Sequence, residues 1–279
     1  MIQELKQKFG SLAKALDVFY VIQSIKPCSR IMVKEDMYKS VKSSLESYKL
    51  FVEKSNFKVL KLDKGDFSNK SERIKLDDER QGYYFVYFSK DKNLAKKAND
   101  YEEKEDHINL GLSLGYPKCC CEFFKENAEI QKKKFNDYIL PALKNSKGFV
   151  FPFYTNCAIR YFDFSLLSHF PCNFNCKESI EIGKKHLTAI EKDSIHVFAE
   201  LRDMLKSAVI YTENYGIFIL REPKIEGSKV SYGIVVGNKE NNLSNSLVKH
   251  KKLEVIDKNH IRVGDEDIKT DNLGFMFFI

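Results

Sequence analysis

Two short segments of this chain each place a proline close before cysteines. Residues 115–124 read GYPKCCCEFF, with three consecutive cysteines, and residues 169–179 read HFPCNFNCKES. Proline suits the first turn of a helix, where its missing N–H costs no hydrogen bond. The pattern therefore predicts that both groups of cysteines lie at or near a helix N-terminus.

The composition limits what these cysteines can do. The chain has 279 residues, of which 43% are hydrophobic and 30% charged, as in folded globular proteins. The opening MIQELKQKFG does not read as a signal or transit peptide, and no apolar stretch has the length of a membrane span. We therefore expect a cytoplasmic protein, where disulfides are uncommon. Its seven cysteines then indicate metal ligation, catalysis or core packing.

The charge pattern gives weaker information about partners. The net charge is +7, but acidic residues are interspersed among the lysines and no long run of like charge occurs. Such a pattern favours a solvated, lysine-rich surface over a nucleic-acid-binding tail. Nucleic acid is thus a less favoured partner, and a membrane is not expected.

Hydrophobic periodicity predicts an α+β fold, with a helical N-terminal and central part that includes a small β element, followed by a β-rich C-terminal part. Apolar residues at helical spacing predict helices over residues 2–24, 34–54, 91–114, 117–141 and 176–207. Strands are predicted over 57–63 and 83–89, with a polar loop or short hairpin over 68–82.

After residue 208 the chain carries six apolar runs separated by turn residues, which predict short strands. We therefore expect a mainly helical core with the cysteine motifs over residues 1–207. A β-rich C-terminal subdomain is expected over residues 208–279.

The spacing of the cysteines selects candidate metal ligands. Adjacent residues on a helix point about 100° apart, so Cys119, Cys120 and Cys121 cannot all reach one ion. A helix N-terminus favours a thiolate, which is the metal-binding and nucleophilic form of cysteine. The predicted ligands are Cys119, Cys120, Cys172 and Cys176. Reactive thiols without a metal, or packing alone, are the alternatives, and Cys28 and Cys157 are expected to pack.

Four thiolates indicate a soft or borderline metal. Zinc and an iron–sulfur cluster both fit such a ligand set, whereas magnesium and calcium do not. If only three thiolates bind, the remaining position could take substrate, sulfide or water.

Three neighbouring residues are candidates for catalysis. His169 lies three residues before Cys172 and could act as an acid or base, or be structural. Asn156 and Arg160 lie in an aromatic segment that we expect to be buried. A buried arginine needs an anionic partner, either a substrate phosphate or carboxylate or an internal acid.

The motifs resemble those of a prokaryotic, largely archaeal family, the domain of unknown function 483. Its pattern is Leu-Gly-Tyr-Pro-x-Cys-Cys, followed later by His-x-Pro-Cys-x3-Cys-x2-Ser. The matching positions are Leu114 to Cys120, then His169, Pro171, Cys172, Cys176 and Ser179. The resemblance covers roughly residues 105–185. It leaves Cys121 outside the pattern and implies no established activity.

The leading hypothesis is a cysteine-ligated metal protein that modifies a nucleotide, an RNA or a small metabolite. In it His169 serves as acid or base, and Arg160 holds an anionic group of the substrate. One alternative is a non-catalytic, zinc-stabilised module that binds RNA or protein. Another is a metal-free thiol oxidoreductase that uses Cys172 and Cys176.

Overall fold

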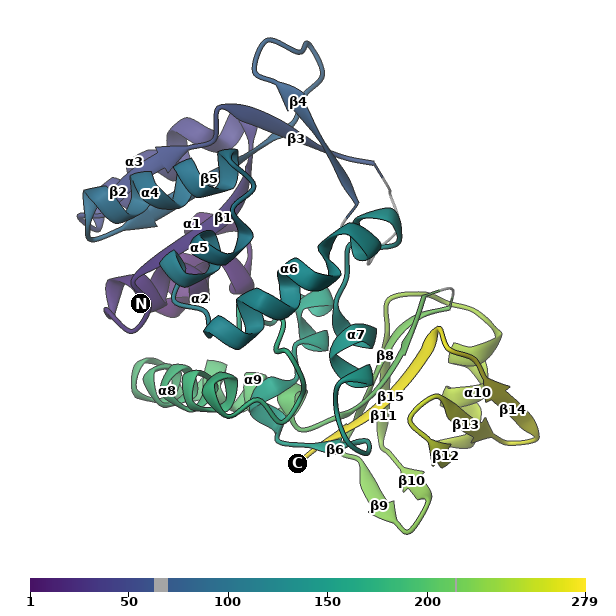
Figure 1. Cartoon of the computed structure of the whole chain (residues 1–279). Coiled ribbons are helices and arrows are strands. Elements are labelled where there is room, and N and C mark those ends of the chain that lie inside the picture. The colour runs from purple at the N-terminus through teal and green to yellow at the C-terminus, as the bar shows by residue number, and fades with distance from the viewer. Residues whose placement is uncertain (63–69, 214) are drawn as a thin grey trace. The chain divides into compact units, whose positions relative to one another are not determined.

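The computed structural model describes residues 1–62, 70–213 and 215–279 (Figure 1). Over these residues the fold is α+β, as predicted, with helices in the N-terminal and central parts and sheets in the C-terminal part. The described residues divide into two compact units. The first unit comprises residues 1–62, 70–136 and 185–194, and the second comprises 137–184, 195–213 and 215–279. The predicted subdomain over 208–279 stays a prediction.

The first unit combines helices with one antiparallel sheet. Its helices are α1 (Ile2–Phe9), α2 (Leu12–Ile22), the 3-10 turn η1 (Glu35–Met37), α3 (Tyr38–Ser47), α4 (Lys92–Glu103), α5 (His107–Ser113) and α6 (Lys118–Lys133). Its strands are β1 (Cys28–Lys34), β2 (Phe51–Lys54), β3 (Phe57–Lys61), β4 (Ser71–Lys75) and β5 (Tyr83–Ser89). Over the described residues they pair in the order β1-β5-β3-β4, with β2 also on β5.

Different helices pack on the two faces of this sheet. On one face, the Ser29 hydroxyl donates to Asp17 of α2 at 2.9 Å, and the ring of Tyr38 packs edge-on against Tyr84. On the other face, Tyr87 packs in a cluster with Ala98 of α4. Because side chains alternate between the faces of a strand, α2 and α3 lie on one side of the sheet and α4 on the other.

The second unit is built around two sheets. Its helices are α7 (Ile139–Lys144), η2 (Phe153–Thr155), η3 (Ala158–Phe162), α9 (Ile195–Leu205) and α10 (Asn242–His250), and α8 (Lys177–Asp193) begins in it and ends in the first unit. Its strands are β6 (Val150–Phe151), β7 (Ala208–Thr212), β8 (Gly216–Arg221), β9 (Lys224–Glu226), β10 (Lys229–Ser231), β11 (Ile234–Gly237), β12 (Lys252–Asp257), β13 (His260–Val263), β14 (Glu266–Lys269) and β15 (Leu273–Phe278).

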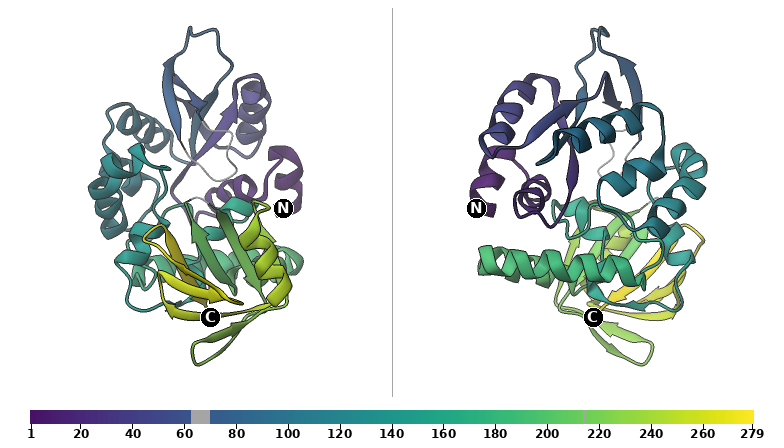
Figure 2. Two further views of the ribbon diagram at one scale, coloured as in Figure 1. Left: turned by 90° about the vertical axis from the view of Figure 1, so that its right-hand side faces the viewer. Right: turned by 60° about the vertical axis from the view of Figure 1, so that its left-hand side comes forward.

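These strands form the sheets β11-β8-β7-β15-β6 and β14-β13-β12-β10-β9 over the described residues. The pair β15–β6 is parallel, and the other pairs in these two sheets are antiparallel over the described residues. Strands β7 to β15 are coloured green to yellow in Figure 2. Phe218 and Phe275 of one sheet, Val255 of the other and Leu247 of α10 belong to a single buried cluster. That shared core accounts for most of the apolar runs after residue 208.

Several predicted helices are shorter in the structure. The helix predicted over 2–24 is two helices, because Gly10 is left-handed with φ 65° and Ser11 caps the next helix through its side chain. The helix predicted over 91–114 is likewise broken where Glu105 has φ 54°. The predictions over 117–141 and 176–207 also each correspond to two helices. A left-handed residue ends a helix, and such residues cannot be read from apolar spacing.

The helix predicted over 34–54 is wrong at both ends. Strand β1 extends to residue 34, and residues 51–54 form β2; both strands pair with β5. Pairing with a distant strand thus outweighs local helical spacing there. Strand β4 lies within the loop or hairpin predicted over 68–82, of which residues 68 and 69 lie outside the described residues.

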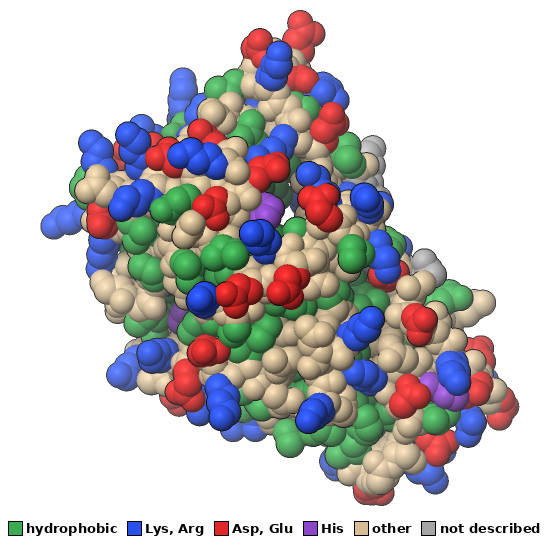
Figure 3. Space-filling model, in the orientation of Figure 1, with side chains coloured by type: hydrophobic (Ala, Val, Ile, Leu, Met, Phe, Trp, Pro, Cys, Tyr) green, Lys and Arg blue, Asp and Glu red, His purple; other side chains and the backbone are tan. Residues whose placement is uncertain are grey.

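On the face shown in Figure 3, Lys and Arg side chains are intermixed with Asp and Glu, in keeping with the interspersed charges of the sequence. Within the described part of the chain, no helix has both the length and the apolar character required to cross a bilayer.

A left-handed glycine shapes the turn from α5 into α6. Gly115 has φ 78°, and the next residue, Tyr116, donates its backbone N–H to the Gly111 carbonyl. A Cβ added to Gly115 would lie 2.7 Å from Cδ of Pro27. The position therefore excludes a side chain for two reasons, backbone conformation and lack of space.

Replacing Gly115 with alanine should lower the free energy of unfolding by about 2–4 kcal/mol, from left-handed strain and overpacking together. Gly10→Ala is the matched control, because Gly10 is also left-handed but nothing lies within 4 Å of its added Cβ. It should cost only about 1 kcal/mol. Urea unfolding measures both, and equal losses would show that Pro27 moves aside without cost.

Candidate metal centre

The start of α6 supplies the first pair of cysteines. Pro117 precedes the helix, so Cys119 and Cys120 are its second and third residues. Their Sγ atoms lie 3.9 Å apart. Cys120 is only 2% exposed, and Cys119 is half-buried. The first turn of a helix carries partial positive charge, which favours thiolate over thiol at both positions.

Cys121 turns away from this pair and packs against α5. Its Sγ would lie only 2.5 Å from a Cβ added to Gly111, so the glycine leaves room for the sulfur. Burial raises the pKa of Cys121 to about 11, and it raises those of Cys28 and Cys157 to about 12. These three thiols are therefore protonated at neutral pH, as expected of packing residues.

The second pair of cysteines flanks a turn before α8. The Cys172 Sγ accepts a hydrogen bond from the Asn173 side-chain amide at 3.5 Å. Cys176 is 5% exposed and comes directly before α8, which begins at Lys177, one residue later than predicted. Its Sγ lies 3.7 Å from a carboxylate oxygen of Glu178.

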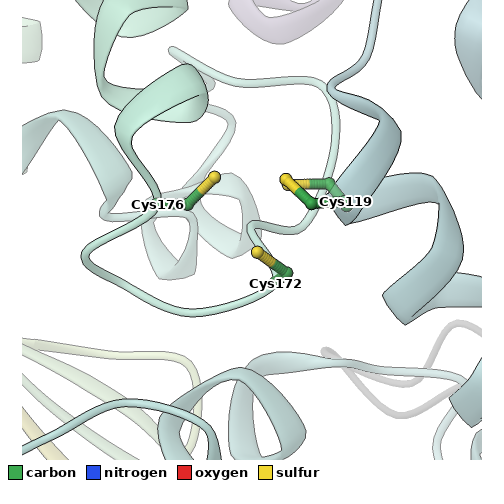
Figure 4. Close-up of side chains that lie close together, drawn as sticks. Cys119, Cys172 and Cys176 are labelled. Carbon is green, nitrogen blue, oxygen red and sulfur yellow. The ribbon is translucent and has the colours of Figure 1, made fainter.

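The four sulfur atoms converge. Those of Cys119, Cys120, Cys172 and Cys176 all lie within 4.8 Å of one another. Figure 4 shows the sulfurs of Cys119, Cys172 and Cys176 pointing toward one another. The prediction that the two pairs meet is confirmed, and four cysteines this close together could hold a metal ion.

Arg160 fixes the backbone that leads to Cys172. Its guanidinium donates to the carbonyl oxygens of Leu167 at 3.1 Å and His169 at 2.9 Å. It also lies over the ring of Phe170, with Cζ 4.0 Å from the ring centroid. These contacts hold the loop, whereas the role predicted for Arg160 in binding a substrate anion stays a prediction.

Further hydrogen bonds hold the loop between the two cysteines. The Thr155 hydroxyl donates to the Phe174 carbonyl at 2.7 Å, and the Phe174 N–H donates to the Ser146 hydroxyl at 2.8 Å. The Asn145 amide donates to the Cys172 carbonyl at 3.3 Å. Sequence reasoning missed these residues because they are far from the motifs along the chain and have no characteristic spacing.

A contact between the side chains of His169 and Ser179 joins the two ends of the second motif. His169 is 6% exposed, and its Nε2 lies 2.9 Å from the hydroxyl of the fully buried Ser179. His169 is not one of the residues whose ligand atoms converge with the four sulfurs. This contact lies within the motif, and the predicted role of His169 as acid or base stays a prediction.

Asn156 contacts the end of α9. Its side-chain amide donates to the Leu205 carbonyl at 3.0 Å and to the Ser207 hydroxyl at 3.2 Å. The bond to Leu205 satisfies one of the carbonyl groups that have no hydrogen-bond partner within the helix at its C-terminus. The catalytic role predicted for Asn156 stays a prediction.

The positive charge of Arg160 interacts with a buried acid of the same unit, Asp137. Asp137 is buried and accepts hydrogen bonds from the Ile139 N–H at 2.8 Å and from the Tyr161 hydroxyl. Burial raises its pKa to about 6, although the Ile139 N–H and the Arg160 charge act in the opposite direction. Arg160 thus has an acid of the chain nearby, which was the alternative to a substrate anion.

Comparison with known proteins identified no relative of this chain. No family model matches the chain, and no match is found among the curated proteins or the solved structures. The resemblance to the domain of unknown function 483 therefore rests on the two motifs alone.

The buried carboxyl of Asp137 should make stability depend on pH. Its folded pKa of about 6 lies above the unfolded value of about 3.9, so stability is lost as pH rises through 6. The full effect is about 3 kcal/mol. We expect Asp137→Asn to lose less stability than the wild type between pH 4.5 and pH 7.5 in urea unfolding. Equal losses would show that this carboxyl ionises normally.

Proposed function

We propose that this protein binds one zinc ion through the thiolates of Cys119, Cys120, Cys172 and Cys176. Cys119 and Cys120 belong to the start of α6, and Cys172 and Cys176 belong to the loop that precedes α8. The observation that supports this proposal is the mutual distance of the four sulfur atoms, none above 4.8 Å.

The distances favour a single ion over an iron–sulfur cluster. Zinc–sulfur bonds of about 2.3 Å give a regular tetrahedron with edges of about 3.8 Å. The Cys119 and Cys120 sulfurs, 3.9 Å apart, already match such an edge. A cluster distributes its cysteine ligands over two or more iron atoms, which pushes the sulfurs farther apart. Movements of roughly 1 Å would complete the zinc tetrahedron.

Four protein ligands favour a structural role for the metal. Structural zinc sites are closed by four side chains, whereas catalytic sites keep one position for water or substrate. We therefore favour the zinc-stabilised module over the metal-dependent enzyme, and activity on a nucleotide, RNA or small metabolite stays a prediction. The motif resemblance supports a further proposal, that the chain belongs to the domain of unknown function 483.

Metal analysis of protein purified without chelators tests the proposal. We expect one zinc per chain, no acid-labile sulfide and no visible absorption. Iron with sulfide in equal amounts would contradict zinc and indicate a cluster. Metal-free protein with a Cys172–Cys176 disulfide would contradict the metal site and favour the thiol oxidoreductase.

Serine variants test the ligand set. Cys120→Ser and Cys176→Ser should weaken zinc binding by on the order of a hundredfold or more, because each removes one thiolate. Cys121→Ser is the matched control, since its sulfur packs on Gly111 outside the converging group. Competition with a chromophoric chelator measures the affinities.

Circular dichroism establishes that each variant is folded. Zinc loss in Cys121→Ser as large as in Cys120→Ser would overturn the assignment of ligands. Removal of zinc from the wild type should also lower its melting temperature, because an ion that binds only the folded chain stabilises it.

A further inference from the structure

The face of the first unit's sheet on which α4 packs also carries arginine and aromatic side chains side by side. Arg30 of β1 is in register with Tyr87, and Val59 of β3 is in register with both Arg73 and Tyr83. Paired residues, and residues two apart on a strand, share a face. The side chains of Arg30, Phe57, Arg73 and Phe85 therefore lie on the same side, and we call this set the arginine–phenylalanine face.

Each arginine of this face lies over a phenylalanine ring. The Arg30 Cζ is 4.6 Å from the centroid of the Phe85 ring, and the Arg73 Cζ is 4.4 Å from that of Phe57. The two rings contact each other edge to face, with centroids 5.8 Å apart. The two guanidinium groups thus pack on a pair of phenylalanine rings that contact each other.

A buried carboxylate holds both arginines in place. Glu102 of α4 is 5% exposed and accepts hydrogen bonds from Arg30 and, at 2.7 Å, from Arg73. Burial favours its neutral form, but the two guanidinium charges outweigh that effect and lower the pKa of Glu102. The side chains of both arginines remain 34% exposed. Ion pairing to Glu102 therefore leaves part of each arginine side chain accessible.

Lysines extend the positive charge over the same face. Lys34 is in register with Tyr83, and Lys75 is in register with Phe57. Lys61 lies with its Nζ 5.7 Å from the centroid of the Tyr83 ring. All three lysines are exposed. They add three positive charges beside an arginine pair whose described ion pairs are with Glu102 and Glu105. Glu53 of β2, in register with Tyr87, is an acidic residue on the same face.

We propose that the arginine–phenylalanine face binds a single-stranded nucleic acid. Unpaired bases stack on guanidinium planes and aromatic rings, and Arg30 and Arg73 present such planes already fixed in position. Phosphates would pair with the lysines around them. Bases in a duplex are stacked on one another, so a duplex cannot use this face in the same way. The proposal is independent of the metal centre.

Fluorescence anisotropy with a labelled 12-nucleotide single-stranded RNA, at about 150 mM salt, tests this proposal on the full chain. Arg73→Ala should weaken binding by between about fivefold and a hundredfold, the effect of one lost stacking contact. Arg73→Lys keeps the charge but loses the plane, so it should weaken binding nearly as much. Lys61→Ala should weaken binding less and reduce the salt dependence, as loss of a phosphate contact does.

Arg80→Ala is the matched control. Arg80 belongs to the same unit, is 57% exposed and pairs with Asp78, but it lies over no aromatic ring of the described residues. This variant loses the same charge as Arg73→Ala and should change the affinity by less than about twofold. Circular dichroism checks the fold of each variant, and Lys61→Ala carries the test if Arg73→Ala does not fold.

Three results would overturn the proposal. The first is no binding of the RNA by the wild type below about 100 μM, the weakest affinity typical of non-specific binding. The second is an equal loss of affinity in Arg80→Ala and Arg73→Ala, which would indicate diffuse charge instead of stacking. The third is a duplex of the same sequence that binds as tightly as the single strand.

Discussion

Like-charge repulsion among four sulfur atoms is the constraint on which the site depends. Within 4.8 Å of one another, four thiolates would repel strongly unless a cation lay among them. The alternative is that the thiols keep their protons, which the helix N-terminus at Cys119 and Cys120 opposes. A metal ion would resolve this conflict, since it binds the charged form and would remove the repulsion. A metal bound there and the start of α6 would therefore favour the same ionisation state of Cys119 and Cys120.

The chain holds the two ligand pairs by different means. Cys119 and Cys120 are placed by a helix whose start is set by a left-handed glycine and a proline. The loop with Cys172 and Cys176 has no regular structure of its own and is held by side chains that bond to its backbone. Regular structure suffices for the first pair, whereas the second requires a surrounding network. Loss of one such bond should therefore affect the second pair more than the first.

The sequence predicted correctly those features that are set by residues close together along the chain. The helix starts predicted at residues 117 and 176 lie one residue before those of α6 and α8. The separate environment of Cys121 followed from helical geometry. Apolar runs also identified the β-rich C-terminal part. Strands β1 and β2 were not predicted, because their identity depends on pairing with β5, which lies far along the chain. The partners of His169 and Arg160 were hidden for another reason, because they lie in an irregular segment where the spacing of residues does not indicate which side chains meet.

The buried contact between His169 and Ser179 has an entropic meaning. It joins the two ends of an eleven-residue segment, so that Cys172 and Cys176 belong to a closed loop and not to an open chain. Closing the loop limits the conformations open to the backbone between its ends. Part of the entropy needed to bring the two side chains together is thereby lost on folding, before any ligand is bound.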